Sequence, residues 1–303
     1  MYQTKDLLRE LRDIFPDLVI KEQEPMKLHT SFRIGGPCDL MVFPKSKKEL
    51  KGILRLLYEK KITPYVLGGG TNVLVSDEGI RGVLICMKDA LTDLQMNNEA
   101  TIVAGSGVSM ARLANFAADH SLTGLEFAQG IPGTVGGGMF MNAGAYGGEM
   151  RDCAVSTCYL NMDGSEGVMV GEEQGLGYRT SAFQKLNVII TETVFSLKHG
   201  DTAQIRETMK DLAQRRRSKQ PLELPSAGST FKRPEGYFAG VLIEQAGLKG
   251  FSVGGAMISP KHAGFVVNTG GATAADVKDL IRSVQERVLA DSGILLEPEV
   301  QMI

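Results

Sequence analysis

Cysteine is scarce in this sequence, and its spacing does not suggest metal or redox chemistry. The four cysteines form no CxxC pair, and none lies close to a histidine along the chain: Cys38, Cys86, Cys153 and Cys158. This pattern excludes a zinc ribbon and a thioredoxin-like site, and no metal site is expected. We interpret the four as free, buried thiols of a protein in a reducing compartment.

Net charge and long apolar runs are also lacking. Lys and Arg number 33 against 35 Asp and Glu, so the formal net charge is −2 and no global field attracts nucleic acid or an anionic membrane. No segment approaches the ~20 apolar residues of a membrane span. The first twelve residues mix charges with leucines and lack the apolar run of a signal peptide. We therefore expect a cytoplasmic protein with neither nucleic acid nor membrane as a partner.

Glycine, by contrast, is abundant, at 36 of 303 residues. A predicted strand at 39–44 is followed by a helix that Ser46 and Glu49 cap, and a second strand at 65–67 runs directly into Gly68-Gly69-Gly70-Thr71-Asn72. A strand that leads into a glycine loop is typical of phosphate binding, because glycine lets the backbone N–H groups approach an anion closely.

The rest of the chain alternates helices and strands without strict βαβ repetition, which indicates an α+β fold. Residues 1–30 are expected to form a short helix and a polar lead-in, and the texture changes near residue 201. The last helix is capped by Thr273 and Asp276 and ends at Gly293. Further strands are expected at 82–87, 100–104, 154–160 and 188–197. Further helices are expected from Ser109, from about residue 201 to the basic run 215–219, and over 238–246.

A second glycine loop covers residues 130–148, with eight glycines in nineteen residues. A set of tight turns would explain some of them, but a long loop that is neither charged nor serine-rich is better suited to wrap a large, partly apolar ligand. The Gly105-Ser-Gly107 segment is only a weak Rossmann signal, because Met110 stands where the third glycine belongs. A Walker loop is excluded, because no glycine-lysine-Ser/Thr sequence occurs.

Five separate motifs together resemble the UDP-N-acetylenolpyruvoylglucosamine reductase family. They occur in family order over nearly the whole chain: YVLGGGTNVLVS from Tyr65, GIPGTVGG from Gly130 with NAGAYG from Asn142, the pair Tyr178-Arg179, PSAGSTFKRP from Pro225, and LEPEV from Leu296. Longer family members carry an inserted loop with a tyrosine over the UDP-sugar. This chain has little room for it and so resembles the shorter branch, in which the residue that replaces the tyrosine is an open question.

The resemblance implies an FAD-binding fold of the vanillyl-alcohol-oxidase type in two subdomains, plus a C-terminal α+β substrate-binding domain. The expected boundaries are 1–85, 86–200 and 201–303. It also implies non-covalent FAD on the two glycine loops. The implied cofactor-binding residues are Tyr65, Gly68, Gly69, Gly70, Thr71, Asn72, Gly130, Ile131, Pro132, Gly133, Gly136, Asn142, Gly144, Ala145 and Tyr146.

The activity implied is the NADPH-dependent reduction of UDP-N-acetylglucosamine enolpyruvate to UDP-N-acetylmuramate in bacterial peptidoglycan synthesis. Hydride from the flavin would reach C3, and a proton would reach C2. By their match to the family motifs, Arg179 would stabilise charge on the substrate carboxylate, Ser229 would donate the proton, and Glu299 would assist. Glu297 lies two residues away and could be confused with Glu299, although the motif favours Glu299.

The basic run from Arg215 to Lys219 allows more than one interpretation. It lacks the interleaved aromatics of a nucleic-acid site, and cations at a helix C-terminus are favourable in any case. The resemblance adds a third interpretation, in which Arg216 and Lys219 face the UDP-sugar, with Lys232 and Gln245 as weaker candidates.

Two other functions fit parts of the pattern. A flavoprotein oxidase of the same fold is one, although no histidine lies within either glycine loop to tether a flavin. A nucleotide-sugar binding protein without catalysis is the other, and the presence of Arg179, Ser229 and Glu299 argues against it. We expect a monomer whose only partners are its small-molecule substrates.

Overall fold

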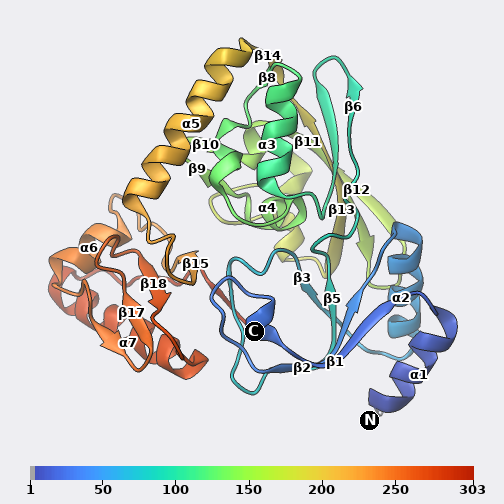
Figure 1. Cartoon of the computed structure of the whole chain (residues 1–303), viewed down its shortest axis with the longest axis horizontal. Coiled ribbons are helices and arrows are strands. Elements are labelled where there is room, and N and C mark those ends of the chain that lie inside the picture. The colour runs from blue at the N-terminus through green and yellow to red at the C-terminus, as the bar shows by residue number, and fades with distance from the viewer. Residues whose placement is uncertain (1–3) are drawn as a thin grey trace. The chain divides into compact units, whose positions relative to one another are not determined.

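The computed structural model describes residues 4–303, which form two compact units (Figure 1). Unit 1 comprises residues 4–22, 39–69 and 82–214, and unit 2 comprises 23–38, 70–81 and 215–303. Each unit has its own hydrophobic core. No helix among the described residues is long and apolar enough to cross a bilayer.

Unit 1 begins with a four-stranded sheet of order β1-β2-β5-β3, in which β3 and β5 run parallel. Its helix α2 buries a leucine and isoleucine stripe, and the Ser46 hydroxyl caps the helix by accepting a hydrogen bond from the Glu49 N–H at 3.2 Å. The elements of this part are α1 (Thr4–Ile14), β1 (Val19–Pro25), β2 (Pro37–Phe43), α2 (Lys47–Glu59), β3 (Tyr65–Leu67) and β5 (Ile80–Cys86), of which β1, β2 and β5 extend into unit 2.

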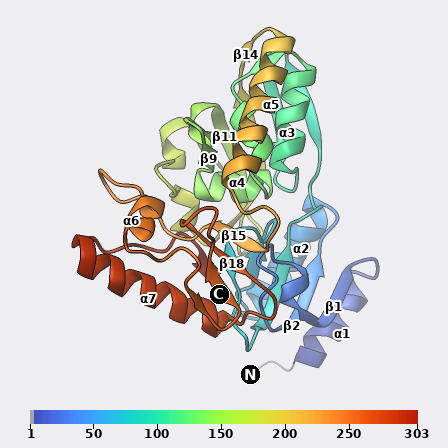
Figure 2. The same cartoon turned by 60° about the vertical axis from the view of Figure 1, so that its left-hand side comes forward.

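The second part of unit 1 is a five-stranded antiparallel sheet of order β12-β11-β13-β7-β6. Its helices α3 and α5 lie beside each other (Figure 2), where Arg206 donates to Asn115 at 2.8 Å. The elements are β6 (Leu94–Asn98), β7 (Thr101–Gly105), α3 (Met110–Asp119), β8 (Leu122–Thr123), α4 (Val135–Met141), β9 (Gly144–Ala145), β10 (Gly148–Glu149), β11 (Ala154–Asn161), β12 (Glu166–Val170), β13 (Val188–Ser196), β14 (Lys198–His199) and α5 (Thr202–Lys219).

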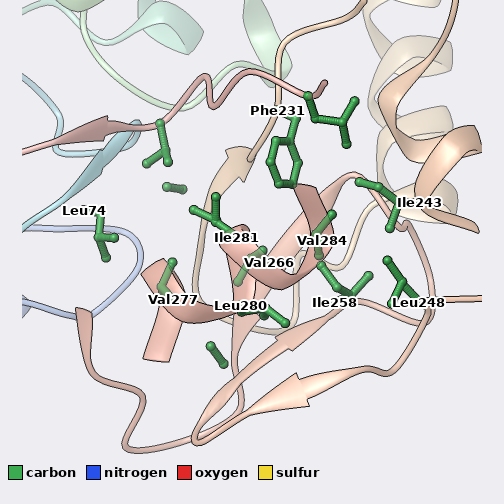
Figure 3. Packing of buried hydrophobic residues seen from close by; sticks show 14 of the residues in the cluster. Leu74, Phe231, Ile243, Leu248, Ile258, Val266, Val277, Leu280, Ile281 and Val284 are labelled. Carbon is green, nitrogen blue, oxygen red and sulfur yellow. The ribbon is translucent and has the colours of Figure 1, made fainter. Parts of the chain in front are cut away.

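Unit 2 is built on the antiparallel sheet β15-β18-β17-β16. Side chains of α7, of α6 and of the sheet meet in one core, with Phe231, Ile243 and Leu280 among its members (Figure 3). The elements are β4 (Val73–Leu74), β15 (Ser226–Ser229), α6 (Ala239–Gln245), β16 (Ser252–Val253), β17 (Ala256–Ile258), β18 (Phe265–Asn268), α7 (Ala274–Ser292) and β19 (Gln301–Met302), and β19 pairs in parallel with β4.

Short single-turn 3-10 helices complete the described chain: Met26–Leu28, Glu126–Gly130, Met150–Asp152, Gly171–Gln174 and Ala182–Gln184.

Most predicted elements are present, and the α+β class is confirmed. The expected capping box of α7 is formed by Thr273 and Asp276, and Gly293 ends the helix in the left-handed conformation. Two predictions were wrong. The polar lead-in contains strand β1, which lacks the alternation of a half-buried strand, and the glycine loop contains helix α4, which forms because Thr134 caps it and Val135 and Met139 are buried.

The two compact units divide the chain differently from the sequence boundaries. Unit 1 runs through most of α5 and ends at Gln214, whereas composition indicates a change near residue 201. The three-part division at 1–85, 86–200 and 201–303 stays a prediction.

Candidate functional site

The two glycine loops meet within unit 1. A Cβ added to Gly69 would lie 2.7 Å from the Cα of Gly133, and one added to Gly68 would lie 2.9 Å from Oγ1 of Thr134. Real Cβ atoms do not approach backbone carbon so closely, so Gly69 is required by the packing of one loop on the other. Gly133, with φ of +118°, adopts a conformation that favours glycine.

This pair of loops has backbone donors to offer. Within residues 4–303, the N–H groups of Gly68, Gly69, Gly133 and Thr134 make no hydrogen bond to another protein group. A cluster of such N–H groups on glycine-rich backbone suits a diphosphate. A Cβ at the exposed Gly137 would meet nothing closer than Thr134 Oγ1 at 3.7 Å, an ordinary van der Waals contact. These features fit the diphosphate of FAD.

In the Gly105–Gly107 loop, by contrast, the backbone N–H groups are hydrogen-bonded within the protein. Its N–H groups donate to Asp93, Thr191 and Leu91 within the fold, and an added Cβ at either glycine would collide with a backbone carbonyl. The loop therefore has no backbone N–H group left for a phosphate. Its glycines serve close packing, which agrees with the weakness of the Rossmann signal.

The remaining predicted cofactor residues of unit 1 lie at the entry to the first loop or within the second. Tyr65 is 46% exposed in β3, at the entry to the first loop. Gly130 ends a 3-10 turn, and Ile131 and Pro132 continue from it. A Cβ at Gly136 would lie 2.9 Å from the Cβ of Ser106, so this glycine is required by packing.

Asn142 ends α4 in the left-handed conformation, with φ of +44°. Its side chain is fully buried, and the amide nitrogen donates to the Gly177 carbonyl at 2.8 Å and to Oε2 of Glu149 at 3.0 Å. The amide oxygen accepts from the Arg151 N–H at 3.0 Å. Both amide protons are therefore used inside the protein, and its role as a cofactor contact stays a prediction for its main chain alone. Gly144 and Ala145 follow in β9, and the exposed Tyr146 has φ of +55°.

Arg179 lies on a tight turn between Gly177 and Thr180. Its φ is +53°, and its guanidinium donates from Nη2 to the Gly144 carbonyl at 3.2 Å. The guanidinium also lies 5.1 Å from the centre of the Tyr178 ring. The predicted catalytic arginine is thus held next to the end of the second glycine loop.

In unit 2, the first loop continues through Gly70, Thr71 and Asn72. Gly70, with φ of +64°, packs against the backbone of His29 so closely that a side chain would not fit. Asn72 donates from Nδ2 to the Glu299 carbonyl at 3.2 Å and accepts from the Gln301 N–H at 3.0 Å. The loop and the C-terminal segment therefore brace each other.

Ser229 and Glu299, which are 70 positions apart in sequence, are brought onto adjacent chain segments. The Glu299 N–H donates to the carbonyl of Thr230 at 2.8 Å, and Phe231 and Pro298 form an isolated bridge. Ser229 is exposed at the end of β15, and Glu299 is half-buried. The exposed hydroxyl of Ser229 and the carboxyl group of Glu299 therefore belong to neighbouring segments.

The other predicted substrate residues are spread over unit 2. Arg216 and Lys219 lie in the last turn of α5, and Gln245 is the exposed last residue of α6. Lys232 pairs with Glu297, the neighbour of Glu299, at 3.2 Å on an exposed surface. Glu297 therefore has a cationic partner at the surface.

The Cys153 thiol is buried in unit 1. Burial, with help from Asp152 and Glu126, raises the pKa of the Cys153 thiol to about 12, so it is no nucleophile at neutral pH. Within residues 4–303, no group of three or more His, Cys, Asp or Glu side chains is placed to hold a metal ion.

Sequence reasoning missed three residues of the site in unit 1. Thr134 caps α4, Glu149 receives the Asn142 amide, and Gln184 donates to the Arg179 carbonyl at 3.1 Å. Thr134 had a local signal, since a threonine before a helix is a common cap. Glu149 and Gln184 had none, because their contacts depend on tertiary structure.

Family models and curated relatives match most of the chain. A family model described as an FAD binding domain matches residues 38–166, and one described as the UDP-N-acetylenolpyruvoylglucosamine reductase C-terminal domain matches residues 220–303. The UDP-N-acetylenolpyruvoylglucosamine reductase of Syntrophomonas wolfei is 49% identical over 294 residues, covering 97% of this chain and 98% of that protein. That of Exiguobacterium sibiricum is 48% identical over 300 residues, covering 99% and 98%.

Among solved structures, UDP-N-acetylenolpyruvylglucosamine reductase from Thermus caldophilus matches with a TM-score of 0.80 at 35% identity, covering 94% of this chain and 98% of that chain. The FAD-binding fold of the vanillyl-alcohol-oxidase type and the FAD cofactor are thereby confirmed. The chain belongs to the UDP-N-acetylenolpyruvoylglucosamine reductase family and is an FAD-dependent oxidoreductase.

Proposed function

We propose that this enzyme reduces UDP-N-acetylglucosamine enolpyruvate to UDP-N-acetylmuramate, with NADPH as the source of hydride, in bacterial peptidoglycan synthesis. The observation that carries the proposal is the hydrogen bond from the Glu299 N–H to the Thr230 carbonyl, which places the Ser229 and Glu299 segments side by side. Family membership supports the substrate, since the relatives bear the name of this reaction.

FAD, when bound, supplies two-electron hydride chemistry between NADPH and the enolpyruvyl double bond. Gly68, Gly69, Gly133 and Thr134 would hold its diphosphate through their backbone N–H groups. Gly70, Thr71 and Asn72 are assigned to the same cofactor by resemblance. Lys219, Arg216, Lys232 and Gln245 are assigned to the UDP-sugar in the same way.

Three residues of the chain are assigned to charge stabilisation and proton transfer: Arg179, Ser229 and Glu299. Hydride addition at C3 of the substrate moves negative charge onto its carboxylate, so a fixed cation stabilises the transition state more than the ground state. Arg179 is assigned this role. Ser229 donates a proton from Oγ to C2, and Glu299 assists at the same centre. A serine hydroxyl is a weak acid, so this transfer requires a site from which water is excluded.

The test is anaerobic visible spectroscopy of the two half-reactions, with wild type and the Ser229→Ala variant. NADPH should bleach the flavin band of both proteins equally. The enolpyruvyl UDP-sugar should restore the band quickly in wild type and about 10²- to 10⁴-fold more slowly in the variant, the range that a general acid typically contributes. Ser252→Ala removes an exposed serine from β16 in the same sheet and serves as the control, with both rates unchanged.

Two results would overturn the proposal. Equal slowing of both half-reactions in Ser229→Ala would remove Ser229 from proton donation. A wild-type flavin that bleaches and recovers only with oxygen would identify an oxidase of the same fold.

A further inference from the structure

The turn that carries Arg179 is strained and heavily supported. A φ of +53° is a conformation that a long L side chain rarely adopts, and such residues persist only where the surroundings hold them. The turn is closed by reciprocal hydrogen bonds between Gly177 and Thr180, of 3.0 and 3.2 Å. Both of these bonds lie within the turn, so they do not attach it to the rest of the fold.

Two buried or half-buried amides tie the turn to helix α4. Asn142, at the C-terminus of α4, donates to the Gly177 carbonyl at 2.8 Å. Gln184 donates from Nε2 to the Arg179 carbonyl at 3.1 Å and to the Phe140 carbonyl at 2.8 Å. The turn is thus bound on its entry side by one amide and at Arg179 itself by the other.

The same helix connects this turn to the second glycine loop. Thr134 begins α4, and Phe140 in its last turn accepts hydrogen bonds from both Gln184 and Ser181, the latter at 2.7 Å. The guanidinium of Arg179 donates to Gly144, just beyond the helix. The backbone of Arg179 is therefore tied through Gln184 to the last turn of α4, and its side chain is bonded to β9, which follows the helix.

We propose that Asn142 and Gln184 are positioning residues that hold Arg179 in its left-handed turn and so aim its guanidinium at the substrate. This inference rests on the proposed role of Arg179 in stabilising the substrate carboxylate. The two amides touch neither substrate nor cofactor in this assignment, since both amide protons of Asn142 and two carbonyl contacts of Gln184 are satisfied within the protein. The expected signature is a loss in the chemical step without a loss in flavin reduction.

The test uses Gln184→Met, which keeps the side-chain length and removes the donors. Reoxidation of the reduced holoenzyme by the enolpyruvyl UDP-sugar should slow about 100-fold, the typical cost of a displacement of about 1 Å in a positioned group. Bleaching by NADPH should be unchanged. Hydrogen exchange at the Thr180 amide, which is bonded to Gly177, should accelerate.

Gln174→Met is the matched control. Gln174 is a fully buried amide of unit 1 that lies as many positions before Arg179 as Gln184 lies after it, but it donates to the backbone carbonyls of Ala154, Val155 and Gly171 and makes no hydrogen bond to the Gly177–Thr180 turn. It should lose stability without a change in either half-reaction or in Thr180 exchange. Gln184→Glu, which places a carboxyl group against the same two carbonyls, gives a second variant if the methionine variant does not fold.

A double-mutant cycle separates this inference from the proposed function. If Gln184 acts through Arg179, then Gln184→Met should slow reoxidation no further in an Arg179→Ala background. Full additivity of the two changes, or an unchanged reoxidation rate in Gln184→Met, would overturn the positioning role. A normal reoxidation rate in Arg179→Ala alone would instead overturn the assigned role of the arginine, on which the inference depends.

Discussion

Single atoms decide which glycines matter in this protein. Gly69 has an ordinary backbone conformation, yet its missing Cβ lets it lie against Gly133, whereas a Cβ at Gly137 would make only an ordinary van der Waals contact, at 3.7 Å. Both residues belong to glycine-rich sequence motifs. Their different costs of substitution come from their neighbours and not from their own dihedral angles.

We expect Gly69→Ala to separate the two glycine loops and weaken FAD binding. The Cβ would lie 2.7 Å from backbone carbon, which a side-chain rotation cannot relieve. Unfolding should be easier by about 1–3 kcal/mol, the usual cost of overpacking. The ratio of flavin to protein absorbance after purification, together with the denaturant midpoint, measures both effects.

Gly137→Ala is the comparison for this prediction. Its Cβ meets nothing closer than 3.7 Å, and alanine is favoured over glycine within a helix by about 0.5–1 kcal/mol. This variant should be as stable as wild type or more so. Equal destabilisation of both variants would show that loop packing at Gly69 is unimportant.

At the scale of elements, capping residues satisfy the free backbone groups at helix ends. Helix α7 begins with a capping box in which the Thr273 N–H donates to Oδ2 of Asp276 at 2.9 Å and Oγ1 of Thr273 accepts from the Asp276 N–H at 3.0 Å. The Gly255 N–H also donates to Asp276, at 3.2 Å. These backbone donors hold the pKa of the Asp276 carboxyl below its usual value of 3.8.

The cap should make stability depend on pH in the acid range. Because the folded pKa of Asp276 lies below its unfolded value, the contribution is present above the unfolded pKa and is lost as pH falls through the folded pKa. Asp276→Asn should cost about 1 kcal/mol at neutral pH, and the difference from wild type should shrink below pH 4. Urea melts at a series of pH values measure the difference.

Asp279→Asn provides the control, since this carboxylate lies on the same helix and pairs with Arg282 at the surface. Its difference from wild type should be small, because exposed ion pairs contribute little. A difference for Asp276→Asn that stays constant down to pH 2 would contradict the assignment of the carboxyl group to the cap.

At the scale of the whole molecule, the cores are separate. The core of Figure 3 lies entirely within unit 2, and the other two lie entirely within unit 1. Each unit therefore buries its own apolar surface. A ligand that binds only the folded chain adds stability by mass action on top of these cores.

Removal of FAD should accordingly lower the melting temperature. FAD at a hundred times its Kd should restore about 2.7 kcal/mol to the free energy of unfolding. Calorimetry of the apoprotein titrated with FAD tests this, with adenosine diphosphate as the comparison ligand that carries the diphosphate without the flavin. A melting temperature independent of FAD would mean that the folded apoprotein does not bind FAD through the two glycine loops.

Much of the fold could be predicted because its signals are local. The strand at 65–67, the Ser46 cap and the box of Thr273 and Asp276 each depend on residues within a few positions of one another. Helix α4 was not predicted, since its three glycines oppose helix formation, and the Thr134 cap and the burial of Val135 and Met139 offset this. Strand β1 was missed for the same reason, because pairing with β2 overrides its charged sequence.

The sequence by itself determined the family, the α+β class, FAD as cofactor and the identity of the candidate residues, because motif residues are read in order along the chain. Only the tertiary structure decided which glycine loop has free N–H groups, since Gly68 and Gly105 look alike until their partners are known. It likewise turned Asn142 toward the interior and brought Gln184 to Arg179. The physical reason is that hydrogen bonds between distant segments depend on how the chain packs, which no local pattern records.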